Sequence, residues 1–196
     1  MGRCESGLRL KGPDDGIIRI GIMSILTTRL ALVIILFIVV LYAATLVAAN
    51  TSITQRTIQI EVTINASASK VWQVLTDFEA YPQWNPFIRQ MTGAARPGEQ
   101  LMAELHSGGR TMTIRPTVLV VQPERELAWI GRLFIPGVFD GEHSFIIEPL
   151  GDRVHFVQSE TFKGVLVPFS GAILSDTERS FQGMNQALKE RAEQAP

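Results

Sequence analysis

The chain of 196 residues is poor in the residue types on which many catalytic and nucleic-acid-binding sites depend. It has one cysteine, Cys4, so it can form no disulfide within itself and offers no thiol nucleophile beyond the N-terminus. Its 18 basic and 19 acidic residues are interleaved and give a net charge of −1, so no basic stripe is available for a nucleic-acid backbone. We therefore expect neither thiol chemistry nor a nucleic-acid partner.

The sequence also lacks the compact motifs of common enzyme classes. It contains no Gly-Lys-Ser or Gly-Lys-Thr phosphate loop and no Gly-x-Ser-x-Gly nucleophile elbow. Of its three histidines, His106 and His155 do not stand at metal-ligand spacing with each other or with carboxylates. We expect no metal and no cofactor.

One long apolar run dominates the N-terminal part of the chain. Residues 30–49 read LALVIILFIVVLYAATLVAA, which is twenty positions without a charge. A helix of this length extends about 30 Å, the thickness of the hydrocarbon core of a bilayer. No face of such a helix is polar enough to meet water. The run therefore predicts one transmembrane helix, with residues 1–29 before it and a short polar linker, residues 50–55, after it.

The distribution of positive charge predicts the orientation of that helix. Lys11, Arg19 and Arg29 lie within about twenty residues before it, whereas only Arg56 lies in the corresponding window after it. Positive charge favours the cytoplasmic side of a membrane. The expected protein is a single-pass membrane protein with a cytoplasmic N-terminus and a C-terminal domain outside the cytoplasm.

A cleaved signal peptide is the alternative interpretation of the same run. The small residues that end at Ala49 suit signal peptidase, and the true start could be Met23 instead of Met1. Signal-peptide cores have about 7 to 15 apolar residues, fewer than are present here, which favours a retained anchor. Both interpretations export the same domain.

Residues 56–194 have the length and composition of one domain with a substantial core. Within them, residues 57–65 alternate apolar and polar side chains with the period of a half-buried strand. Ser67 or Ser69 then caps a helix that continues to Phe78.

The rest of the domain is expected to consist of strands followed by one long helix. Pro82 and Pro86 are expected to break the first helix. An amphipathic pattern over residues 171–192 predicts the terminal helix. Short turns between the strands imply an antiparallel meander. Turn signals delimit six strands, at 88–93, 99–106, 111–122, 126–133, 140–149 and 153–162.

Several segments of this domain resemble one known superfamily. Residues 77–87, DFEAYPQWNPF, follow the helix start ASASKVW, and LAW at 127–129, GEHSF at 141–145 and ETFKG at 160–164 come later. Together they resemble the SRPBCC superfamily, which includes polyketide cyclase/dehydrase-like proteins, START-type lipid-transfer domains and the birch pollen allergen fold. The resemblance implies an α+β helix-grip fold, in which a curved antiparallel sheet wraps around the long C-terminal helix and encloses an apolar cavity. It implies no single activity.

The last predicted hairpin places two polar residues in this cavity. If residues 151–152 form a two-residue turn, His143 lies opposite Glu160 and Phe145 lies opposite Gln158. Apolar alternation then points His143 and Glu160 inward, where a buried carboxylate needs a partner. Three roles remain open for the pair: a structural contact, a polar anchor for a ligand, and acid–base catalysis.

The predicted ligand-binding residues lie on the inward face of the sheet, at the cavity mouth or on the terminal helix. Trp84 could instead only seal one end of the core, and Asn85 is expected to bond the backbone of its turn. We expect Trp72, Trp84 and Phe181 to be largely buried. The predicted set is Trp84, Phe87, His143, Phe145, Phe156, Gln158, Glu160, Phe162 and Phe181.

Three classes of function are compatible with these features. The first is a membrane-anchored domain that binds or carries a hydrophobic small molecule, such as a lipid, an isoprenoid or a polyketide-like compound. The second is an enzyme of the cyclase, dehydratase or hydrolase kind that uses His143 and Glu160. The third is a non-catalytic interaction module that assists a membrane complex, for which an occluded or filled cavity would argue. The sequence favours binding over catalysis.

Overall fold

A computed structural model of the protein describes residues 29–43, 55–133 and 135–194, in two units that divide between Ala49 and Asn50. In the first unit, residues 29–43 are helical and their side chains are exposed. The predicted transmembrane helix covers residues 30–49, so its last six residues lie outside the described part. Within the described ranges, no helix combines the length and the apolarity that crossing a membrane needs.

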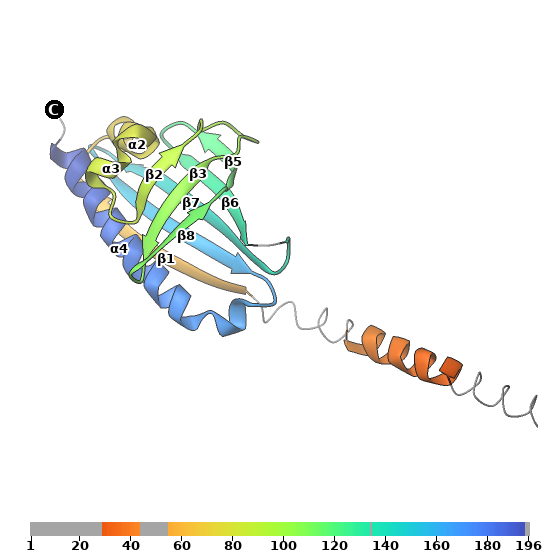
Figure 1. The fold of residues 1–196 in the computed structure, drawn as a ribbon. Coiled ribbons are helices and arrows are strands. Elements are labelled where there is room, and N and C mark those ends of the chain that lie inside the picture. Colours follow the sequence, from red (N-terminus) through yellow and green to blue (C-terminus); the bar gives the residue numbers. More distant parts are fainter. Residues whose placement is uncertain (1–28, 44–54, 134, 195–196) are drawn as a thin grey trace, which may run out of the picture. The chain divides into compact units, whose positions relative to one another are not determined.

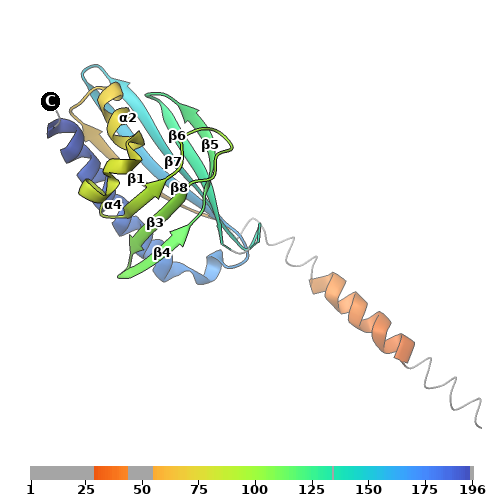
Figure 2. The same ribbon diagram turned by 45° about the horizontal axis from the view of Figure 1, so that its top comes forward.

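The second unit contains two antiparallel sheets (Figures 1 and 2). One has the strand order β1-β8-β7-β6-β5 and the other the order β2-β3-β4. The predicted antiparallel pairing is confirmed, but the meander is divided between the sheets: β2-β3-β4 and β5-β6-β7-β8 each follow the chain order, and β1 pairs with β8. The strands are β1 (Gln55–Ile64), β2 (Ile88–Thr92), β3 (Met102–Ser107), β4 (Arg110–Ile114), β5 (Thr117–Gln122), β6 (Glu126–Leu133), β7 (Phe139–Leu150) and β8 (Arg153–Lys163).

The single strand predicted at 111–122 is wrong. The chain leaves the smaller sheet after Ile114 and enters the larger one at Thr117. Pro116 lies at this change of sheet, where its ring removes a backbone donor and restricts the conformation of Arg115. Close by, Gln100, two residues before β3, forms an isolated antiparallel bridge with Thr117 of β5.

The predicted first helix extends less far than expected. Ser67 caps α2 (Ala68–Thr76) by accepting a hydrogen bond from the Lys70 nitrogen at 3.2 Å. A 3-10 turn, η2 (Phe78–Ala80), and a short helix, α3 (Tyr81–Trp84), follow. Pro82 does not break a helix as predicted but lies in the first turn of α3, where a missing N–H costs nothing.

The turn after α3 is held by Asn85, as its sequence context predicts. The Asn85 side-chain oxygen accepts hydrogen bonds from the backbone nitrogens of Phe87 and Ile88, at 3.0 and 2.8 Å. This buried amide therefore fixes the entry into β2. It also sets Phe87 and Ile88 against the interior, where both side chains are buried.

A second 3-10 turn, η3 (Val167–Phe169), leads into the terminal helix α4 (Gly171–Gln194). This helix packs along β1 and also contacts β3 and α2 (Figure 1), which is the helix-grip arrangement expected of the fold. Its Phe181, Met184 and Leu188 are fully buried in the core. Of the three aromatic side chains expected to be largely buried, only Phe181 is, because Trp72 and Trp84 pack against the core from its edge and stay partly exposed.

Candidate functional site

The hairpin of β7 and β8 has the register predicted from its turn. Gly151 begins the turn with a positive φ of 71°, which a two-residue hairpin turn requires and glycine tolerates. Eleven residues on each side then pair in an unbroken ladder, with His143 opposite Glu160 and Phe145 opposite Gln158. Because side chains alternate along a strand, His143 and Glu160 both lie on the inner face of the sheet.

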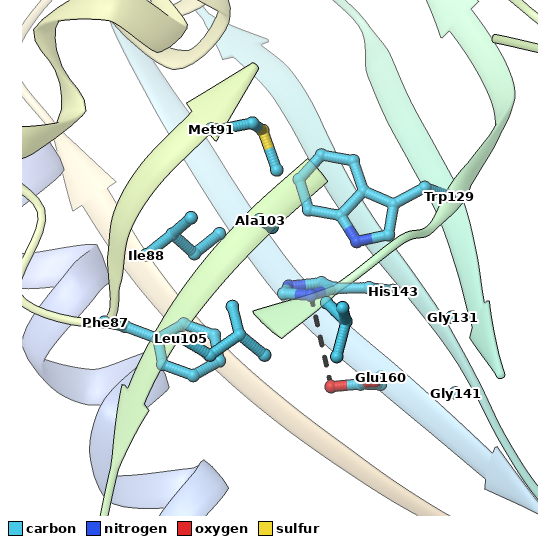
Figure 3. Close-up of a pocket in the computed structure, with 11 residues that line it drawn as sticks. Phe87, Ile88, Met91, Ala103, Leu105, Trp129, Gly131, Gly141, His143 and Glu160 are labelled. Atoms are coloured by element: carbon cyan, nitrogen blue, oxygen red, sulfur yellow. Dashed lines mark ion pairs between the residues drawn. The ribbon is translucent and has the colours of Figure 1, made fainter. Parts of the chain in front are cut away.

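A small cavity lies between the two sheets at this pair (Figure 3). Its volume is about 30 Å³, which is room for one or two water molecules. The smaller sheet forms one wall and β6, β7 and β8 form the other. The lining residues are Phe87, Ile88, Met91, Ala103, Leu105, Ile114, Trp129, Gly131, Gly141, His143 and Glu160.

His143 is held in place by aromatic side chains on three sides. Its ring stacks on Phe145 and on Phe181, with centroids 4.4 and 4.7 Å away, and meets the edge of Trp129 at 5.2 Å. Burial among these rings disfavours a charged imidazole and lowers the pKa of His143 to about 3. The imidazole is therefore neutral at physiological pH.

The proton of His143 faces Glu160. The Gln158 amide nitrogen lies 2.9 Å from His143 Nε2, and because an amide nitrogen can only donate, Nε2 accepts this bond. The ring proton is then on Nδ1, which is 4.0 Å from a Glu160 carboxyl oxygen. That distance is too long for a hydrogen bond, so the two groups point to a common space instead of satisfying each other.

Glu160 occupies space that a glycine leaves free. Gly141 lies diagonally across from it on β7, and a β-carbon there would overlap the Glu160 carboxyl group. Gly131 is paired with Gly141 on the adjacent strand, so two neighbouring positions of the inner face carry no side chain. The Glu160 side chain keeps 16% of its surface exposed. Burial nevertheless raises the pKa of Glu160 to about 8, because a carboxylate here has lost most of its water.

This shift predicts a pH-dependent stability. Between pH 4.5 and about 8 the folded protein keeps a proton on Glu160 that the unfolded chain has released, so the folded state loses stability as the pH rises through this window. We expect Glu160→Gln to gain stability relative to the wild type as the pH rises, with no further gain above about 8. Chemical denaturation of the full chain in detergent across this range measures the difference.

Glu142→Gln is the matched control for that experiment. Glu142 lies beside the site on β7 but points outward and is exposed. Its substitution should shift stability by a similar amount at every pH in the window. If Glu160→Gln behaved in the same way, the carboxyl group would not be buried as described.

Three of the nine predicted site residues line the cavity and six do not. Phe87, His143 and Glu160 line the cavity. Phe145, Phe156, Gln158 and Phe181 are fully buried, and they pack behind the cavity wall. Phe162 is also buried but does not line the cavity, and Trp84 lies at the edge of the core. The polar pair was therefore located correctly, whereas most of the predicted aromatic lining belongs to the core.

The sequence reasoning missed most of the lining. Five of the missed residues come from the smaller sheet, whose packing against the larger one leaves no trace in strand periodicity: Ile88, Met91, Ala103, Leu105 and Ile114. Trp129 and Gly131 lie on β6, which is connected to β7 by a loop too long to set the register. Gly141 lies in the segment GEHSF, but no pattern in the sequence indicates that Glu160 fills the space beside it.

His155 has two carboxylates close to it that its spacing in the sequence does not indicate. On the outer face of the sheet its Nδ1 and Nε2 lie 2.9 and 3.1 Å from carboxyl oxygens of Glu148 and Glu61. The hydrogen bond with Glu148, followed by the one with Glu61, raises the pKa of His155. The three residues are on three adjacent strands, a proximity that only the strand order β1-β8-β7 creates. This solvent-exposed ion cluster is separate from the cavity.

Comparisons with known proteins agree with the architecture. Residues 55–193 match the family model described as polyketide cyclase / dehydrase and lipid transport. No curated protein matches the chain. Among solved structures, a START superfamily protein from Mycobacterium smegmatis is 26% identical with a TM-score of 0.58, over 70% of this chain and 97% of that one. The Zhui aromatase/cyclase from a Streptomyces species is 18% identical with a TM-score of 0.60, over 71% of this chain and 94% of that one.

Proposed function

Because this chain belongs to the polyketide cyclase/dehydrase and lipid transport family, we propose that its C-terminal domain binds a hydrophobic small molecule between its two sheets. The observation that carries the proposal is the site in Figure 3, where His143 and Glu160 are the only polar side chains among the described residues of an otherwise apolar lining. Sites for small apolar ligands have this composition, because a few polar groups orient the ligand. A lipid, an isoprenoid or a polyketide-like compound fits this chemistry.

The charges around the cavity favour a ligand with an uncharged polar group. None of its described lining residues is lysine or arginine, so an anionic head would be buried without a counter-ion. At neutral pH Glu160 is protonated and can donate a hydrogen bond, and His143 Nδ1 can donate another. The ligand therefore carries a hydroxyl or carbonyl oxygen that lies between these two donors.

Acid–base catalysis by the pair is less well supported. A general base works best with a pKa near the operating pH, whereas burial holds the pKa of His143 at about 3. Glu160 could still act as an acid, but its 4.0 Å separation from His143 Nδ1 leaves it without a relay partner. Binding and orientation require no change of protonation at His143, so they agree better with its surroundings.

The volume of the cavity favours one other candidate, a non-catalytic interaction module. Ligand pockets typically measure about 300 to 1,000 Å³, whereas this cavity measures about 30 Å³. A cavity this small is what an interaction module without a ligand would have.

To enter the cavity, a ligand would have to displace Leu105 and Ile114, which are only partly buried and belong to the smaller sheet. β4 is the edge strand of that sheet, so it can move without breaking strand pairs on its outer side.

Native mass spectrometry of the full chain distinguishes the two candidates. After purification in a mild detergent, a binding domain retains a bound molecule of defined mass. Extraction with organic solvent removes this molecule, and incubation with a cell lipid extract restores it. Leu105→Trp, which puts a larger side chain into the lining of the cavity, should prevent that recovery. A chain that carries no such molecule and gains none from the extract would favour the interaction module.

We also propose that residues 30–49 anchor the chain, with the domain outside the cytoplasm. The support is the apolar length and the excess of positive charge on the N-terminal side. Protease added to intact spheroplasts that express the protein is expected to remove the domain. Complete protection would contradict this orientation, and a mature protein that begins at Asn50 would show that the segment is a signal peptide.

A further inference from the structure

Six large apolar side chains are exposed at one end of the C-terminal domain. The most prominent are Phe169, which exposes 85% of its surface, and Ile135, which exposes 67%. Single exposed apolar residues are ordinary, but a cluster of them indicates an interaction surface. The cluster, called the apolar end below, consists of Leu133, Ile135, Val165, Leu166, Phe169 and Ile173.

These side chains come from two segments whose backbones are joined by hydrogen bonds. The backbone nitrogens of Val165 and Leu166 donate to the carbonyl oxygens of Gly137 and Val138, at 3.2 and 3.1 Å. Gly164 allows this close approach, because it has a φ of 137° and a β-carbon there would overlap the Val138 carbonyl. Residues 137–138 before β7 and residues 165–166 after β8 therefore lie side by side.

The chain enters the domain at the same end. Gln55, the first residue of β1, pairs with Lys163, the last residue of β8, which directly precedes the apolar end. In Figure 1 the start of β1, the end of β8 and the start of α4 lie together. Only residues 50–54 separate Gln55 from the apolar run, and five residues extend at most about 18 Å.

Positive side chains accompany the apolar end. Arg56 and Lys163 are exposed on the paired strand ends, and Arg132 is exposed beside Leu133. Asp140 lies 4.0 Å from Arg132, so it compensates part of this charge. Arginine and lysine can keep an apolar stem in contact with lipid tails while their charges reach phosphate head groups.

We propose that the apolar end inserts into the lipid surface of the bilayer that holds the anchor. Phe169 and Ile135 enter the boundary between head groups and acyl chains, and the neighbouring cations contact the phosphates. This inference rests on the proposed anchor, because the short connection brings this end, and not the opposite one, to the membrane. Insertion also turns one end of the β7–β8 hairpin toward the lipid, the end at which Gly141 and Glu160 lie. A ligand can then pass between the bilayer and the cavity.

The test uses a fluorophore on the full chain in vesicles. With Cys4 replaced by serine, Phe169→Cys is labelled with an environment-sensitive dye and the protein is reconstituted into vesicles of phosphatidylcholine and phosphatidylglycerol. The control, Asp152→Cys, carries the same dye in the β7–β8 turn, at the other end of β8 and about 33 Å away along the strand. Lipids with a spin label near the top of the acyl chain should quench the dye at 169 and leave the dye at 152 unquenched.

Other outcomes would overturn the proposal in distinguishable ways. No quenching at 169 would show that the apolar end does not enter lipid, and equal quenching at both positions would show that lipid contact is not specific to this end. A spectral shift at 169 that grows with protein density and not with spin-labelled lipid would identify a second copy of the chain as the occupant. Carbonate extraction of the same vesicles tests the anchor separately, because an anchored protein stays in the membrane fraction. Failure of the anchor and failure of the insertion therefore give different results.

Discussion

Replacing Phe181 with alanine is expected to lower the free energy of unfolding by about 3 to 5 kcal/mol. Phe181 is fully buried in α4, and its ring stacks on His143 at 4.7 Å and meets the edge of Phe87 at 5.6 Å. The substitution removes the aromatic ring from the contact between the terminal helix and both sheets. Because the helix and two sheets cannot all move inward together, most of the space stays empty and the lost contacts are not replaced.

Denaturant unfolding of the full chain in detergent measures this effect, with tryptophan fluorescence as the signal. All three tryptophans lie in the domain, so its unfolding is what the fluorescence reports. Ile173→Ala is the matched control, since Ile173 is on the same helix but 45% exposed, and it should cost less than about 1 kcal/mol. A similarly small loss for Phe181→Ala would mean that the ring borders a void and contributes little to the core.

Local patterns in the sequence were sufficient for the parts of the fold that depend on neighbours in the chain. A two-residue turn at 151–152 determines which residues of β7 and β8 face each other, so His143 and Glu160 could be paired by counting. The capping serine, the Asn85 turn and the amphipathic terminal helix are local in the same sense. Each depends on residues a few positions apart.

The features that could not be predicted depend on contacts between distant segments. The division of the strands into two sheets depends on the chain turning at Pro116, and a proline within an apolar run can equally end a strand or lie in an edge strand. The size of the cavity depends on how the smaller sheet packs over β6, β7 and β8. Inward-facing phenylalanines such as Phe145 and Phe156 could line a cavity or fill a core, and alternation does not distinguish the two.

The chemistry of the cavity lining favours an uncharged ligand over an anion. At neutral pH the domain should bind decanol at least about 100-fold more tightly than decanoate, which corresponds to roughly 2.7 kcal/mol. Both molecules have the same chain length, so their apolar contacts are similar. Decanoate must lose the water around its charge in a cavity whose described lining has no cation to replace it, whereas decanol can accept hydrogen bonds from Glu160 and His143.

Substitution of Glu160 separates this head-group effect from general loss of structure. Glu160→Leu removes the donor and keeps a side chain of similar bulk, so decanol should bind about 10-fold more weakly, as expected for one hydrogen bond. An apolar fluorescent dye should bind the variant as well as it binds the wild type. Equal weakening of the dye and the alcohol would indicate a collapsed site.

The most direct test of the proposed binding site is equilibrium dialysis of the full chain in detergent, against decanol and against decanoate at pH 7. The free ligand concentration is then measured outside the protein compartment. A blank with detergent alone corrects for partition of the ligand into micelles. We expect saturable binding of decanol that Glu160→Leu weakens, and little or no saturable binding of decanoate. Binding of decanoate as tight as that of decanol, or binding of both that is unchanged in Glu160→Leu, would contradict it.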